Sequence, residues 1–114
     1  MSSIEPLIQV DIEQHLMNLG QRLEVEVETF HKMSVNRAEA EADFKRDYHR
    51  AILKAQAGTV AEKESAAHIF ASAAFREWKI LEAQEKATQQ KLMSLRTQID
   101  SARTMAANVR ALGG

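Results

Sequence analysis

Apolar residues recur every three or four positions along most of this chain, which is the spacing of one buried helical face. In the first half, this spacing links Leu16, Leu19 and Leu23. In the second half, one stripe alternates steps of three and four over nearly three heptads: Leu92, Leu95, Ile99, Ala102, Ala106 and Val109. This alternation is typical of a coiled-coil or helix-bundle contact. The pattern predicts an all-α fold.

One short segment interrupts the helical pattern. Between residues 21 and 110 there is no proline, and the only glycine is Gly58. Glycine is favoured just past a helix C-terminus. Thr59 followed by Glu62 has the spacing of a capping box, which starts a new helix. Because one helix ends and another begins within three residues, the chain is expected to double back as a long antiparallel helical hairpin.

A short N-terminal helix is expected before the hairpin. Pro6 suits the first turn of a helix, and Gly20 is a weak point where that helix should end. Residues 24–28 alternate glutamate and valine as a strand would, but their neighbours keep helical spacing and predict helix. The expected single domain of 114 residues comprises helices at residues 1–19, 21–57 and 59–111.

The composition predicts self-association. Although 45% of the residues are apolar, alanines make up much of that fraction, and there are only one tryptophan, one tyrosine and four phenylalanines. An elongated two-helix fold with so few large side chains buries a small fraction of its surface. We therefore expect a homo-oligomeric helical bundle. The interface is predicted at Phe70, Trp78, Leu92, Leu95, Ile99, Ala106 and Val109.

Several classes of chemistry find no support in the sequence. There are no cysteines, the four histidines lack metal-binding spacing, and no nucleophile-elbow, phosphate-loop or dinucleotide motif is present. We expect no catalytic site, metal or cofactor. No apolar run is long enough for a membrane span or a signal peptide, so a cytoplasmic protein without membrane contact is predicted.

Charge is distributed unevenly along the chain, although the total is only −1. Residues 1–43 carry nine acidic and three basic side chains, whereas residues 86–114 carry five basic side chains and one acidic. An acidic first part and a basic last part suggest an anionic partner or head-to-tail contacts between copies.

Two clusters of basic residues are candidates for binding nucleic acid. The first precedes the turn and comprises Lys45, Arg46, Arg50 and Lys54. Tyr48 lies among them and could stack on a base, although its spacing from Phe44 and Ile52 favours a place in the core. The second cluster is Arg96, Arg103 and Arg110, which repeat every seven residues on one helical face. Either cluster is also explained as a solvated helix face.

The layout around the turn resembles that of a known family. Residues 45–55 form a basic helical run, KRDYHRAILKA, before the short turn, and residues 98–110 read QIDSARTMAANVR, which is basic and rich in small residues. Over residues 38–110 the chain resembles small phage-encoded recombination mediators of the UvsY-like group. The resemblance implies a ring-like cytoplasmic homo-oligomer that binds single-stranded DNA. Such proteins help to load a RecA-like recombinase onto strands covered by single-strand-binding protein.

By position, the resemblance assigns DNA contacts to the basic run before the turn and assembly contacts to the last helix. The sequence is compatible with two functions. One is a non-enzymatic, DNA-binding recombination mediator. The other is a protein-interaction module, such as a phage inhibitor of a host defence complex or a helical scaffold, in which the acidic first part binds a protein and no DNA is bound.

Overall fold

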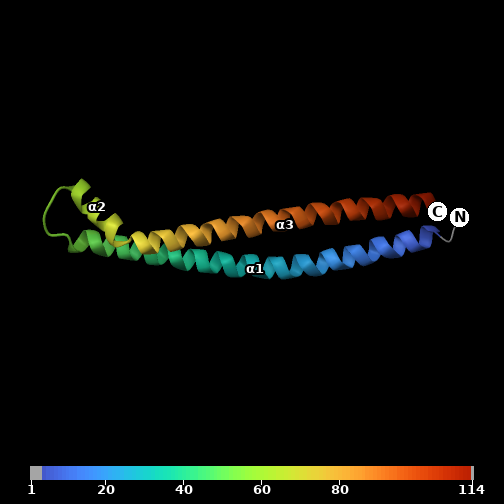
Figure 1. Ribbon diagram of the computed structural model, residues 1–114, viewed down its shortest axis with the longest axis horizontal. Coiled ribbons are helices and arrows are strands. Elements are labelled where there is room, and N and C mark those ends of the chain that lie inside the picture. Colours follow the sequence, from blue (N-terminus) through green and yellow to red (C-terminus); the bar gives the residue numbers. More distant parts are fainter. Residues whose placement is uncertain (1–3, 114) are drawn as a thin grey trace. The chain divides into compact units, whose positions relative to one another are not determined.

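The computed structural model describes residues 4–113, and it is helical over nearly all of them. Helix α1 spans Ile4–Lys54, α2 spans Val60–Phe70 and α3 spans Ser72–Gly113 (Figure 1). No strand occurs among these residues. The all-α prediction is confirmed, and residues 24–28 lie within α1 despite their alternating sequence.

The expected break at Gly20 is wrong, because α1 continues through it as one helix of 51 residues. Glycine inside a helix costs about 1 kcal/mol relative to alanine. On either side of it, Leu19 is almost completely buried and Leu23 packs against the same core cluster. Tertiary packing therefore outweighs the weak local preference. The helices expected at residues 1–19 and 21–57 form one helix over their described residues, and this helix ends at Lys54.

The turn lies where the sequence predicts it. Gly58 has a φ of 110°, in the left-handed region that favours glycine. Thr59 is the N-cap of α2, and its hydroxyl accepts a hydrogen bond of 3.2 Å from the backbone amide of Glu62. A side chain at Gly58 would meet the Glu62 carboxylate, since an added Cβ would lie 2.8 Å from its Oε2 atom. The φ of 110° is therefore the reason for the glycine, because the Glu62 carboxylate is the far end of a flexible side chain and can move aside.

The second long helix, expected unbroken over residues 59–111, is divided at Ala71. This residue has φ −92° and ψ 12°, between α2 and α3. Its amide still donates to the carbonyl of Ala67, at 2.9 Å, so the chain bends without losing that hydrogen bond. Ala67 and Ala71 are both almost fully buried. Alanine is the best helix former, so the bend does not come from a helix-breaking residue.

The chain divides into two compact units. One unit combines the part of α1 that ends at Thr29 with the part of α3 that begins at Thr88. The other unit is the continuous segment from Phe30 to Ala87. In both units, buried or half-buried side chains recur in steps of three and four. On α1 these positions run without a skip from Ile12 to Ala51, and on α3 they run from Ala74 to Val109. This is the heptad pattern of coiled coils.

The unit formed by the two ends has an aliphatic core. Leu19, Leu95, Ile99 and Ala102 form a buried cluster, with Leu16 and Leu23 packed against it. Lys91 Nζ lies 2.9 Å from Glu26 Oε1 beside this core. Within this unit, later residues of α1 meet earlier residues of α3, so the two helical segments run antiparallel.

This core contains most of the residues predicted to join separate chains. Leu92, Leu95, Ile99 and Ala106 are buried within a single chain, and Val109 is half-buried. The helical segment of α1 in the same unit covers the seam that the sequence analysis left half-covered. Assembly stays a prediction, but these side chains would have to leave the present core to contact a second copy.

The unit from Phe30 to Ala87 has an aromatic core. The Phe44 ring lies 5.3 Å from the ring of Phe75 and 5.5 Å from that of Trp78, measured between centroids. The Tyr48 ring lies 5.8 Å from Phe44 and 4.9 Å from His68 on α2. Stacked and edge-on aromatic pairs at these separations add to the stabilisation from burial. Trp78, one of the predicted interface residues, is thus a core residue of this unit.

Candidate nucleic-acid interface

An open hollow of about 470 Å³ lies beside the turn, between the end of α1 and α2. Its lining is mostly apolar. Arg50, Lys54 and Asp47 provide the charged groups at its edge. The full lining is Asp47, Arg50, Ala51, Lys54, Ala55, Ala66 and Phe70. We refer to this feature as the turn hollow.

The four basic residues predicted before the turn fall into two pairs with different surroundings. Lys45 Nζ lies 3.7 Å from Glu41 Oε2, one helical turn away. Arg46 lies 3.3 Å from Asp43 and 3.6 Å from Asp47. Both cations are therefore partly neutralised by acids on the same helix.

Arg50 and Lys54 differ from that first pair. Both are exposed, and in the described part of the chain neither has a carboxylate within ion-pair distance. They are four residues apart, so about 6 Å of helix axis separates them and both line the turn hollow. The structure thus brings together two of the four predicted cations as unpaired charges on one surface.

The aromatic residue beside these cations is Phe70, which the sequence analysis assigned to an oligomer interface. Phe70 is 69% exposed, and it lines the turn hollow from the last position of α2. Tyr48, the aromatic residue considered for stacking on a base, packs between Phe44 and His68. The sequence held no signal for the exposure of Phe70, because Ile69 directly before it is 76% exposed as well.

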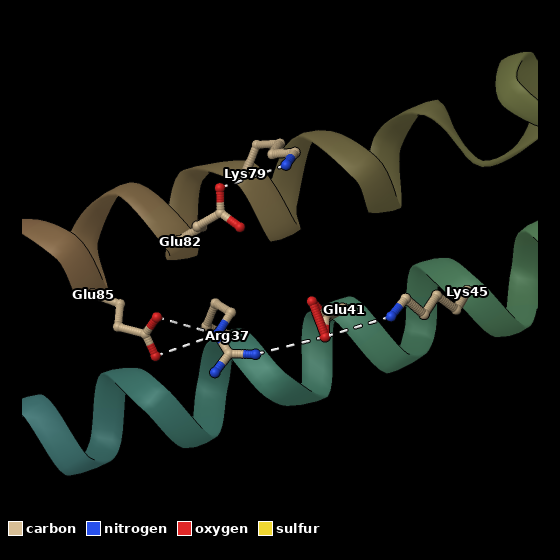
Figure 2. Close-up of polar contacts among 6 residues, drawn as sticks. All are labelled: Arg37, Glu41, Lys45, Lys79, Glu82 and Glu85. Atoms are coloured by element: carbon tan, nitrogen blue, oxygen red, sulfur yellow. Dashed lines mark hydrogen bonds and ion pairs between the residues drawn. The ribbon is translucent and has the colours of Figure 1, made fainter.

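A network of ion pairs explains why Lys45 is less available than its position suggests (Figure 2). Arg37 Nε donates to both carboxylate oxygens of Glu85 at 3.2 Å, which joins α1 to α3 within this unit. Arg37 also lies 3.6 Å from Glu41, the same carboxylate that pairs with Lys45. Lys45 is therefore the last member of a row of alternating charges that begins with Glu85 and Arg37 between the two helices.

The second predicted basic cluster lies on α3 in the other unit. Arg96 and Arg103 are exposed, and no acid partner is found for them among residues 4–113. Arg110 Nε donates to the carbonyl of Ala106 at 3.3 Å. Asp100 lies four residues after Arg96 and three before Arg103, so its negative charge is on the same face. This stripe is positive, and none of its three members is aromatic.

Between residues 4 and 113, no group of three His, Asp or Glu side chains is arranged to hold a metal ion. None of the helices over this range has the length and apolar content needed to cross a membrane.

The fold and the turn hollow define an all-α protein with a small, cationic, partly aromatic surface beside a tight turn. Comparison of the chain with protein family profiles, with curated proteins and with solved structures finds no match.

Proposed function

We propose that this chain is a non-enzymatic accessory protein that binds single-stranded DNA at the turn hollow. The observation that carries this proposal is the pairing of two unneutralised cations, Arg50 and Lys54, with the exposed ring of Phe70 on one surface. Proteins that bind single strands combine positive charge for the phosphates with aromatic rings for the bases.

The biological role in this proposal comes from the resemblance to UvsY-like mediators. In that role the protein acts in the cytoplasm and helps to load a RecA-like recombinase onto DNA covered by single-strand-binding protein. The proposal includes a long antiparallel hairpin that assembles into an oligomeric bundle. Repetition of a two-cation site in an oligomer would let weak contacts act together along one strand.

Salt dependence provides the test of this function. Binding of a fluorescently labelled oligo-dT is measured by anisotropy over a series of salt concentrations. Each phosphate contact on a single strand contributes about 0.7 to the slope of log affinity against log salt. Replacing Arg50 and Lys54 together by glutamate is therefore expected to weaken binding and to reduce this slope by about 1.4 per site.

The matched control is Lys86→Glu, which changes an exposed lysine of the same unit. This lysine is paired with Glu82 at 3.8 Å and does not line the turn hollow. The control should shift affinity only slightly. If the wild-type protein does not bind oligo-dT at low salt, or if the control weakens binding as much as the double variant, the proposed function is wrong.

A second candidate function is the protein-interaction module. Large apolar side chains near the turn are exposed and would suit a protein contact: Leu53, Val60 and Ile69. This alternative predicts no salt-dependent affinity for DNA. It also predicts that replacing Leu53 and Ile69 by serine abolishes a protein partnership, while the double charge reversal leaves it intact.

A further inference from the structure

We propose that Phe70 is a stacking platform for one unpaired base, which makes the turn hollow selective for single strands over duplex. This inference rests on the proposed function, because it assigns the part of the bound strand that the hollow receives. Arg50 and Lys54 would hold the phosphates on either side of that base.

The exposure of Phe70 distinguishes it from the core aromatic residues. Phe44 is 8% exposed and lies in ring-to-ring contact with three other side chains. Among residues 4–113, no aromatic ring is found in contact with Phe70. Its face is therefore open to a flat ligand, and the two cations beside it favour a ligand that carries negative charge.

The rest of the turn hollow has the properties that a base needs. Ala51, Ala55 and Ala66 are small, so they leave room beside the Phe70 ring without offering side-chain hydrogen bonds. Asp47 is the one polar acceptor among the lining side chains, and it already lies 3.6 Å from Arg46. Stacking without hydrogen-bond readout tolerates every base. We therefore expect little sequence preference.

Selectivity for single strands follows from the same geometry. In a duplex, each base is stacked between its neighbours and its faces are covered. The exposed face of Phe70 can be used only by a base that has left such a stack. Without this contact, the cations would bind the phosphates of single strands and duplexes alike.

The test compares three substitutions at Phe70 with one at its neighbour. Alanine at Phe70 should weaken binding of oligo-dT by roughly 5- to 150-fold, the range found for loss of one stacked base. Phe70→Leu keeps an apolar side chain but no π-face, so it should weaken binding nearly as much. Phe70→Trp should retain binding. Ile69→Ala is the matched control, because Ile69 is 76% exposed on the same helix but does not line the hollow.

Three further readouts separate stacking from a general loss of contact. The salt slope should be unchanged in Phe70→Ala, because no phosphate contact is removed. The preference of the wild type for oligo-dT over a duplex of equal length should disappear in that variant. In Phe70→Trp, oligo-dT should quench fluorescence beyond the effect seen for the wild type, whose single tryptophan lies in the core.

Three results would overturn the inference. If Phe70→Ala binds oligo-dT as tightly as the wild type while the charge reversal at Arg50 and Lys54 still weakens binding, the function stands and the stacking role is wrong. If Phe70→Leu binds like the wild type, the contact is merely apolar. If Phe70 is required to bind an acidic peptide ending in an aromatic residue, but not to bind oligo-dT, the hollow is a peptide site.

Discussion

Replacing Glu85 by glutamine is expected to lower the free energy of unfolding by about 1–2 kcal/mol. Arg37 Nε lies 3.2 Å from both Glu85 oxygens, and the two side chains are only 27% and 17% exposed. A hydrogen bond to a charged group contributes about 1.5–3 kcal/mol, and loss of one partner from a fully buried pair costs about 3–5 kcal/mol. Since both side chains keep some contact with water and glutamine retains one acceptor oxygen, the lower values apply.

Thermal and urea unfolding followed by far-UV circular dichroism measure this effect. For a domain of this size, 1 kcal/mol corresponds to roughly 4 °C in Tm, so the Glu85→Gln variant should melt about 4–8 °C lower. The control is Glu82→Gln. Glu82 pairs with Lys79 and Lys86 along the surface of α3, and such a pair changes stability by less than about 1 kcal/mol.

A double-mutant cycle decides whether Arg37 and Glu85 act as a pair. Arg37→Met and Glu85→Leu should each destabilise the protein, because each leaves a partly buried charge without this partner. The two together should be neutral or stabilising, as is common when a buried ion pair is replaced by apolar side chains. A coupling energy below about 0.5 kcal/mol would refute the reasoning, because separate and independent sites add to within that amount.

Three more predictions concern single positions in the helices and the turn. Gly20→Ala should raise stability by about 1 kcal/mol, because Gly20 is inside α1 and nothing lies within 4 Å of an added Cβ. Gly58→Ala should instead lower it by about 1–2 kcal/mol, since a φ of 110° is unfavourable for a residue with a Cβ atom; chemical unfolding of both variants checks the opposite signs. Leu95→Ala should cost about 2–5 kcal/mol, because Leu95 is 1% exposed beside Leu19, and a midpoint in urea equal to that of the wild type would contradict this packing.

The turn was predictable because its signals are local. Gly58 and Thr59 encode the end of one helix and the start of the next through backbone conformation and capping, and both lie as expected. The continuity of α1 through Gly20 was not predictable from propensity, because packing of Leu19 decides it. The bend at Ala71 had no signal either, since alanine favours an uninterrupted helix.

The candidate site was predictable in part. Asp43 lies three residues before Arg46, and Glu41 lies four residues before Lys45. Because residues at these spacings are neighbours on a helix, the sequence could have shown that both cations would be partly neutralised. By the same criterion, Lys54 has no acidic neighbour on its helix within four residues. The place of Phe70 in the hollow could not be obtained in this way, because it depends on the bend that directs α2 across the end of α1.

The aromatic core of the unit from Phe30 to Ala87 has a spectroscopic consequence. Every phenylalanine, tyrosine and tryptophan of the sequence lies between residues 30 and 78, so fluorescence and near-UV signals arise from this unit alone. Far-UV dichroism records the helices of both units. If the melting curves from fluorescence and from far-UV dichroism coincide, the aliphatic and aromatic cores unfold together. If the two curves differ, the transition seen by fluorescence belongs to the aromatic core, and the additional transition in far-UV dichroism belongs to the aliphatic core. No added label is needed for this assignment.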